Sequence, residues 1–271
     1  MVKPLVSAGK LVAFDVDGTL VGRELVISPK VKSAIARMLE AGTAGCLVTG
    51  RMYRATVPFA RDLGLEAPVI CYQGAAIVDP GTDEVLAHTA LANEIVRELI
   101  ATAERDGVHL QLYRNDEYYC EARNRFSDLY AALSLTQPVV VPSLREAFAY
   151  SPATKAVIIA DEPLAAAYAE KLRGAFAGRA NVTRSLPEFV EVLDPTVDKG
   201  VALRFVAERL GLSMDRTIAI GDSWNDEPLL RAAGFAIAMG SAPAELRAVS
   251  DAVVGDLEHD GVAEAIERYV L

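Results

Sequence analysis

The sequence predicts an α/β fold in which a doubly wound parallel sheet forms the core and an α+β cap domain is inserted into it. Short apolar runs alternate with helical patterns in the first 82 residues and in about the last 85, as in parallel strands joined by helices. Between these regions, alternating strand patterns flank turn residues, which favours hairpins. We therefore place the core at residues 1–82 and 187–271 and the cap at residues 83–186.

The core elements follow from apolar runs and from helix start and stop signals. Ser28 followed by Pro29 is typical of an N-cap and a first helical turn, and glycines stop several of the helices. The predicted core elements are strands at 11–14, 45–48, 69–72, 189–193, 217–220, 235–239 and 252–254, with helices at 29–41, 52–63 and 199–210, after Ser241 and from Val262. Strands joined by helices pair in parallel, so helices should cover both faces of the sheet.

The cap is predicted because the regular alternation of strand and helix patterns gives way to hairpin patterns. A hairpin is expected where the apolar segments 75–78 and 84–88 flank the turn 79–83, and it leads into the cap. The other predicted cap elements are helices at 93–105 and 163–176 and strands at 109–113, 118–121, 155–160 and 181–184.

Composition narrows the classes of function. The net charge of −10 argues against a nucleic-acid surface and favours a small-molecule partner. No apolar run reaches the roughly 18 residues of a membrane span, and the N-terminus lacks a signal-peptide pattern, so we expect a cytoplasmic protein with no membrane partner. Three cysteines and three histidines are scattered without metal-site spacing, which predicts reduced core thiols and no zinc site.

Two acids follow the first strand. Asp15 and Asp17 stand at the point where an apolar run ends and Gly18 permits a sharp turn. Asp-Gly alone is also a common turn dipeptide, so a simple loop is the alternative. An EF-hand is excluded because the glycine is misplaced and Val26 stands where the closing Glu belongs. Two carboxylates at a rigid strand end suit a site where a cation offsets their charge beside a phosphate.

Polar residues also follow other predicted core strands. Thr49 and Gly50 come after the second strand, and Lys199 opens a helix. A last cluster follows the strand at 217–220 and consists of Asp222, Asn225 and Asp226. Since ligands of an open parallel sheet lie beyond the carboxyl ends of its strands, these side chains are expected to converge.

With these motifs, the sequence resembles the phosphatases of the haloacid dehalogenase (HAD) superfamily, in the Cof-type subgroup with a class IIB cap. The motifs that carry the resemblance are Asp15-Val16-Asp17-Gly18-Thr19-Leu20, Val48-Thr49-Gly50-Arg51, Asp198-Lys199-Gly200 and Gly221-Asp222-Ser223-Trp224-Asn225-Asp226. The resemblance implies a HAD-like, Rossmannoid core and Mg²⁺-dependent hydrolysis of a small phosphomonoester, a sugar phosphate or similar, through an aspartyl-phosphate. We expect a monomer or a homodimer.

The resemblance assigns a role to each motif residue. Asp15 is the expected nucleophile, because a carboxylate can form an aspartyl-phosphate, and Asp17 is the expected general acid and base. The expected phosphate ligands are Thr49, Gly50, Lys199 and Asn225. The expected Mg²⁺ ligands are the Asp15 carboxylate, the Asp17 main-chain carbonyl and the Asp222 carboxylate, with Asp226 supporting them or joining through water.

One position departs from the family pattern. Members of this type often carry Asn-Gly after the third strand, whereas this chain has Gln73-Gly74, so a substrate contact there does not carry over. Substrate specificity is expected in the cap. Arg114, Tyr118, Tyr119 and Arg123 are polar or aromatic enough to touch a sugar, but surface packing explains them equally well, and we assign them no role.

The sequence excludes two other functions and leaves two open. A P-loop is excluded because Arg51 and Met52 replace the lysine and hydroxyl residue of that motif, and a serine hydrolase lacks its second glycine and a histidine relay. A phosphomutase of the same superfamily and a non-hydrolytic phospho-acceptor signalling module remain as alternatives.

Overall fold

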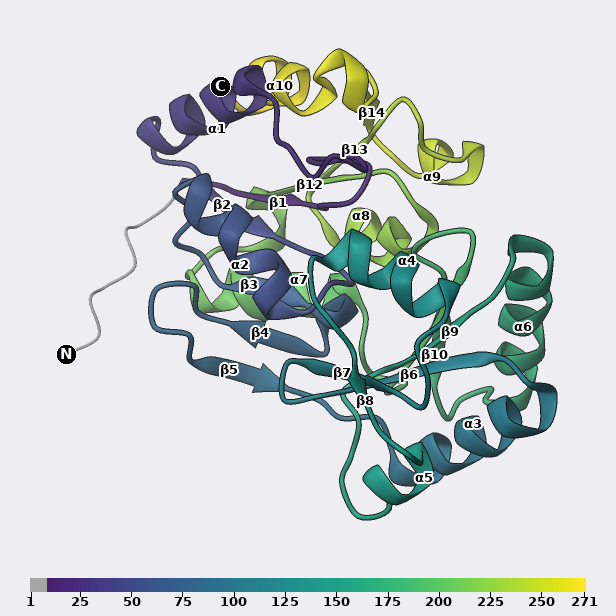
Figure 1. Cartoon of the computed structure of the whole chain (residues 1–271). Coiled ribbons are helices and arrows are strands. Elements are labelled where there is room, and N and C mark those ends of the chain that lie inside the picture. The colour runs from purple at the N-terminus through teal and green to yellow at the C-terminus, as the bar shows by residue number, and fades with distance from the viewer. Residues whose placement is uncertain (1–8) are drawn as a thin grey trace.

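The computed structural model describes residues 9–271 of the chain. Its core is a five-stranded sheet in the order β14-β13-β12-β1-β2, and every pair of neighbouring strands is parallel. The strands are β1 (Leu11–Phe14), β2 (Ala44–Leu47), β12 (Thr217–Gly221), β13 (Phe235–Ala238) and β14 (Ala252–Val253). The chain builds outward from β1 in both directions, so the order reverses between β1 and β12 (Figure 1). The predicted doubly wound fold is confirmed.

Helices cover both faces of this sheet. The core helices are α1 (Pro29–Glu40), α2 (Tyr53–Asp62), α7 (Lys199–Arg209), α8 (Glu227–Ala232), α9 (Ala244–Ala248) and α10 (Gly261–Ala265). The α1 helix begins as predicted, with the Ser28 side chain accepting from the Val31 amide and a proline in the first turn. Apolar residues of α1 and α10 share one core cluster, and those of α7 and α8 pack in another on the opposite face.

The third predicted strand lies beside the core sheet but pairs mainly elsewhere. Strand β3 (Val69–Cys71) meets the end of β2 through a single parallel bridge, Val48 to Ile70. Its ladder partner is β4 (Ala76–Val78), which pairs with β5 (Val85–His88) in a three-stranded antiparallel sheet. The expected hairpin is confirmed. Because the predicted domain boundary between residues 82 and 83 cuts through it, we propose that β5 belongs with the core side.

The cap is a second, mixed sheet in the order β10-β11-β9-β6-β7-β8. Its strands are β6 (His109–Arg114), β7 (Glu117–Cys120), β8 (Val139–Val140), β9 (Ala156–Ile159), β10 (Asn181–Thr183) and β11 (Phe189–Leu193). One face buries Leu110 and Ile158 in a cluster with α3 (Asn93–Asp106), α5 (Leu144–Ala147) and α6 (Glu162–Ala175). The other face carries Tyr113 and Ile159 into the large cluster shared with the core, and α4 (Arg125–Ser134) lies on this side (Figure 1).

Two cap features differ from the sequence prediction. The strand predicted at 189–193 in the parallel core is instead β11, which pairs antiparallel with β9 and β10. Its side chains alternate between the two faces of the cap sheet, so it is buried on both sides there. We therefore propose that the second domain boundary lies after Leu193. Helix α4 was not predicted, although Asn124 caps it with a reciprocal bond to Ser127.

Smaller differences concern the C-terminal region and the thiols. The helix expected after Ser241 begins only at Ala244, because Pro243 occupies its N-cap, and α10 continues as a π-helical turn at Ile266–Val270. All three cysteines are buried free thiols, as predicted. Within residues 9–271, no helix has the length and apolar character needed to cross a membrane.

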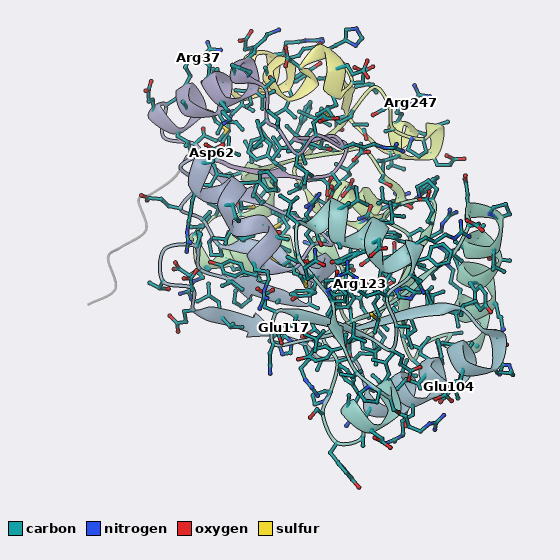
Figure 2. All side chains as sticks on the ribbon, in the orientation of Figure 1. Arg37, Asp62, Glu104, Glu117, Arg123 and Arg247 are labelled. Atoms are coloured by element: carbon teal, nitrogen blue, oxygen red, sulfur yellow. The ribbon has the colours of Figure 1, made fainter. Side chains whose placement is uncertain are left out.

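Charged side chains divide sharply by location. Arg37, Asp62 and Arg247 lie on the outside of the core, and Glu104 and Arg123 on the outside of the cap (Figure 2). A few charged side chains are instead buried, which is costly unless they are paired. They are Asp15, Arg51, Lys155, Glu191, Lys199 and Asp226.

Candidate active site

The two central core strands bring the first acids together. Asp15 follows β1 and Asp222 follows β12, and the Asp15 amide donates to the Ile220 carbonyl at 2.9 Å. Gly18 turns the chain back with a φ of 83°, and a Cβ at that position would collide with the Asp222 carboxylate. Only glycine fits there, because it tolerates both the left-handed backbone and the close approach of Asp222.

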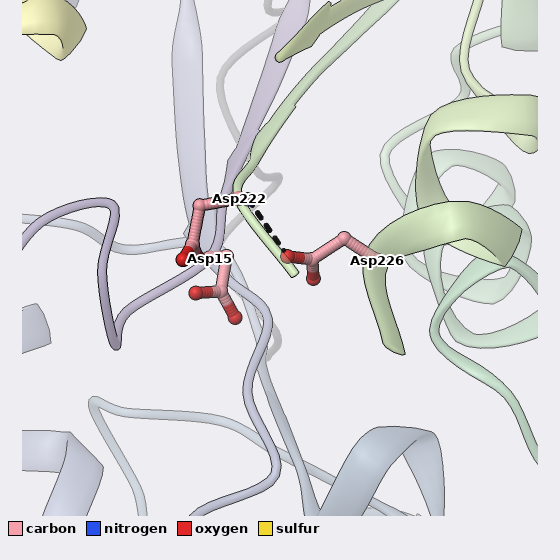
Figure 3. A group of neighbouring side chains, drawn as sticks. All are labelled: Asp15, Asp222 and Asp226. Carbon is pink, nitrogen blue, oxygen red and sulfur yellow. Dashed lines mark hydrogen bonds between the residues drawn. The ribbon is translucent and has the colours of Figure 1, made fainter. Parts of the chain in front are cut away.

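Three carboxylates meet at this edge of the sheet. Oxygen atoms of Asp15, Asp222 and Asp226 all lie within 4.8 Å of one another, and Figure 3 shows them converging from separate segments. Burial, followed by the charge of Asp226, raises the pKa of Asp15 well above its usual value. The same causes raise the pKa of Asp222 to about 7. The cluster therefore carries more negative charge than its surroundings offset.

Lys199 supplies the nearest positive charge. It opens α7 behind the Asp198 N-cap, and its Nζ lies 2.6 Å from Asp15 Oδ1 and 2.6 Å from Asp226 Oδ1. Burial alone would lower the pKa of Lys199, but the two carboxylates raise it, so the ammonium stays charged. A single ammonium thus bridges two of the three acids.

Both carboxylate oxygens of Asp226 accept hydrogen bonds from other groups of the protein. Its Oδ1 accepts from Lys199, and its Oδ2 accepts from the amides of Asp222 at 3.0 Å and Ser223 at 3.1 Å, the former drawn in Figure 3. Asp222 receives a hydrogen bond from the Thr19 hydroxyl at 3.2 Å. Asp226 therefore holds the loop that carries Asp222 and orients it toward Asp15.

The acidic cluster fits a hard divalent cation. Carboxylate and carbonyl oxygens are the preferred ligands of Mg²⁺, and burial followed by the charge of Asp226, the causes that raise the pKa values of Asp15 and Asp222, are both offset by such a cation. The residues present therefore fit the metal that the sequence motifs imply.

Asp17 is held by an arginine that the sequence analysis did not assign. Arg51 binds the Asp17 carboxylate with both prongs of its guanidinium, at 2.8 Å from Nε and 2.6 Å from Nη2. Its Nη1 donates to the Leu133 carbonyl in α4 at 2.7 Å. Arg51 therefore links the core acid to the cap, and its position directly after Thr49-Gly50 was the available sequence signal.

A cavity of about 50 Å³ lies between the core loops and the cap. Five predicted site residues line it, namely Asp15, Asp17, Thr49, Gly50 and Asn225. The other three predicted residues are next to Asp15: Lys199 forms a hydrogen bond with it, and Asp222 and Asp226 share its carboxylate cluster. All eight predicted residues thus gather at one place.

The cap side of the cavity comes from residues that the sequence analysis missed. Tyr130, Leu133 and Ser134 belong to α4, and Lys155 and Glu191 come from the cap sheet. Arg114, Tyr118, Tyr119 and Arg123 do not line this cavity. Tyr118 is buried among Tyr113 and Tyr130, and Arg114 stacks on Tyr119 and Phe148, so packing explains these three residues. Arg123 is exposed and pairs with Asp128 at 3.1 Å.

Comparisons with known proteins agree with this geometry. The haloacid dehalogenase-like hydrolase family matches residues 12–266. The 5-amino-6-(5-phospho-D-ribitylamino)uracil phosphatase YitU of Bacillus subtilis is 28% identical over 96% of this chain and 97% of its own. A haloacid dehalogenase-like hydrolase of Bacteroides thetaiotaomicron has a similar structure, with a TM-score of 0.84, 28% identity and coverage of 96% of this chain and 98% of its own. The HAD subclass IIB sugar phosphatase BT4131 shares the fold with a TM-score of 0.85 at 23% identity, over 97% of this chain and 100% of its own.

The fold and the acidic cluster define a HAD-type enzyme with an inserted cap. The chain belongs to the haloacid dehalogenase-like hydrolases, in the Cof-type group with a class IIB cap, and is a phosphatase of small phosphorylated metabolites.

Proposed function

We propose that this protein is a Mg²⁺-dependent phosphomonoesterase that acts on a sugar phosphate or a similar small metabolite through an aspartyl-phosphate. The observation that carries the proposal is the placement of Lys199, 2.6 Å from Asp15, beside Asp222 and Asp226. Phosphoryl transfer requires mainly positioning and charge neutralisation, and these groups provide both.

In the first half of the reaction, an Asp15 carboxylate oxygen attacks phosphorus and the bond to the leaving oxygen breaks. Asp17 donates its proton to that oxygen, and the alcohol product leaves while the phosphoryl group stays on Asp15. Arg51 holds the Asp17 carboxylate in a fixed orientation. Because both Asp17 oxygens accept from Arg51, one of these two contacts has to open when Asp17 carries the proton for the leaving group.

In the second half, Asp17 takes a proton from a water molecule. The water oxygen attacks phosphorus, the bond to Asp15 breaks, and inorganic phosphate leaves. Asp15 regains its carboxylate and Asp17 is protonated for the next cycle.

The remaining residues bind the phosphoryl group and the cation. Thr49, Gly50, Lys199 and Asn225 are the proposed phosphate ligands. The Asp15 carboxylate, the Asp17 carbonyl and the Asp222 carboxylate are the proposed Mg²⁺ ligands, and Asp226 supports them because its oxygens are already engaged. When bound, Mg²⁺ neutralises charge on the transferring phosphoryl oxygens.

The test is phosphate release by the purified protein with and without Mg²⁺. The substrates are sugar phosphates, nucleoside monophosphates, flavin mononucleotide, pyridoxal phosphate and phosphoglycolate. Asp15→Asn should abolish release, whereas the exposed Asp62→Asn should match the wild type. Near wild-type turnover by Asp15→Asn would refute the nucleophile. Transfer between substrate hydroxyls without release would indicate a mutase, and a phosphorylated state that lasts for minutes would indicate a signalling module.

A further inference from the structure

A second buried ion pair lies on the cap side of the cavity. Lys155 directly precedes β9 and Glu191 lies in β11, and their Nζ and Oε2 atoms are 2.6 Å apart. Both residues are only 2% exposed, and the Lys155 ammonium also lies 4.9 Å from the centre of the Tyr113 ring. Because two charges lose their hydration at such a place, a buried pair is weak evidence for stability and calls for another explanation.

One arm of hydrogen bonds runs from Lys155 to Thr49. Lys155 Nζ donates to the Gly50 carbonyl at 2.6 Å. The Gly50 carbonyl and the Arg51 N–H belong to the same peptide group. This N–H donates to Thr49 Oγ1 at 3.1 Å. Since the Thr49 oxygen accepts this bond, its own proton is directed to another acceptor. The arm therefore presents the Thr49 hydroxyl as a donor at the cavity.

The other arm runs from Glu191 to Asn225. Glu191 Oε1 accepts from Gln73 Nε2 at 2.9 Å, and Gln73 Oε1 accepts from Asn225 Nδ2 at 3.1 Å. A carboxylate paired with an ammonium only accepts hydrogen bonds, so it fixes the orientation of the Gln73 amide and, through it, that of Asn225.

The far end of this second arm points to a ligand. Asn225 is 8% exposed and lines the cavity, and its buried Oδ1 has no hydrogen-bond partner within residues 9–271. A buried acceptor of this kind is costly unless something donates to it. A hydroxyl of the bound ester is a suitable donor to Oδ1, and the second hydrogen of Asn225 Nδ2 can donate to a phosphate oxygen.

The core loops are shaped around this network. Tyr72 and Gln73 both adopt left-handed backbone conformations, with φ values of 52° and 59°, that such side chains seldom take. Gly50 has no room for a Cβ, because it would collide with the Gln73 amide and approach Glu191 Oε1 to 3.2 Å. The glutamine that departs from the family pattern thus has a defined place between cap and core.

We propose that Lys155 and Glu191 are positioning residues: the cap orients Thr49 and Asn225 for phosphate through this buried pair. The inference rests on the proposed function, which makes Thr49 and Asn225 phosphate ligands. Phosphate is then bound tightly only when the cap is seated on the core, since both arms cross between the two sheets.

The test removes both charges together, because a single change would leave the partner buried and unpaired. The variant Lys155→Met/Glu191→Met is compared with Lys171→Met, which removes an exposed cap lysine paired with Asp106. The dissociation constant of inorganic phosphate is measured by titration calorimetry in the presence of Mg²⁺, together with kcat and KM. We expect the phosphate dissociation constant and KM to rise about tenfold in the double variant, kcat to change less, and Lys171→Met to match the wild type.

A dissociation constant within twofold of the wild type in the folded double variant would overturn the inference and leave the proposed function intact. If the wild type binds phosphate but turns over no ester, the proposed function fails and the ratio of the dissociation constants still decides the positioning role. A wild-type chain without phosphate binding would overturn both.

If the double variant does not unfold cooperatively, Gln73→Met decides the matter. The methionine side chain has about the length of glutamine, so this variant removes only the hydrogen bonds that connect Glu191 to Asn225. We expect it to weaken phosphate binding about threefold to tenfold, and unchanged binding would overturn the inference.

Discussion

Within residues 9–271, each of the two regions around the cavity holds one buried lysine, and the two lysines have different partners. Lys199 in the core is 1% exposed and bridges Asp15 and Asp226, whereas Lys155 at the cap sheet is 2% exposed and bridges Glu191 and the Gly50 carbonyl. Both make contacts of 2.6 Å. Lys199 touches the proposed nucleophile, whereas Lys155 touches Glu191 and the carbonyl of Gly50, and neither of these groups is proposed to react.

This contrast separates chemistry from orientation. A charge in contact with the reacting carboxylate stabilises the transition state directly, so its loss should lower kcat. A charge that acts through other residues should change phosphate binding and leave more of the chemistry intact. The core and the cap can therefore be told apart by which kinetic constant responds.

The largest effect is expected from Lys199→Met. Asp15 and Asp226 would lose their shared cation, so kcat/KM should fall about 10³-fold and the free energy of unfolding by about 3–5 kcal/mol. Steady-state kinetics and denaturant unfolding measure the two quantities, with Lys171→Met as the matched control. A loss of less than tenfold would remove the distinction between the two lysines.

The same contrast explains what the sequence could predict. The core site was predictable because each residue lies in a short motif at a strand end, and parallel strands bring such ends together without knowledge of any side-chain contact. Asp15 and Asp222 meet for this reason, since β1 and β12 are neighbours.

The cap side was not predictable in this way. Lys155, directly before β9, and Glu191, in β11, lie 36 positions apart, and only the antiparallel pairing of β9 with β11 makes them neighbours. The strand predicted at 189–193 belongs to the cap sheet, because a short segment with apolar residues on both sides of Glu191 fits a parallel core as well as a cap sheet. Helix α4 was missed although its capping box was visible at Asn124.

Gly18→Ala should give the next largest effect in the core. The new methyl group would displace the Asp222 carboxylate, so activity should fall about 100-fold and more Mg²⁺ should be needed for half-maximal rate. Gly42→Ala is the control, because Gly42 has a similar φ of 82° but open space around it. That variant should lose only about 1 kcal/mol of stability and keep its activity. Equal activity losses in the two variants would show that strain, and not Asp222, is responsible.

Arg51 joins the two regions, so its replacement should affect both kinetic constants. Lysine cannot reproduce the forked contact with Asp17 and also reach the Leu133 carbonyl, and Arg51→Lys should lower kcat/KM about 10-fold to 100-fold. Arg54→Lys, at a half-exposed position that pairs with Asp116, should stay near the wild type. Full activity in Arg51→Lys would mean that a point charge suffices near Asp17.

The smallest expected effect is on the free energy of unfolding and comes from His109, a cap residue away from the cavity. It tests the stability of the cap independently of its role in binding. Burial lowers the pKa of His109 from 6.5 to about 4, and its Nδ1 lies 3.1 Å from Nδ2 of Asn124, whose side-chain oxygen caps α4. The native protein thus binds fewer protons than the unfolded chain between these values, so the free energy of unfolding should fall as pH drops from 6.5 to 4. His109→Gln keeps an acceptor without a charge and should flatten this fall, as followed by denaturant unfolding at several pH values. His259→Gln should not flatten it, because Asp256 raises the pKa of that exposed histidine, and an unchanged slope in His109→Gln would assign the acid sensitivity to other groups.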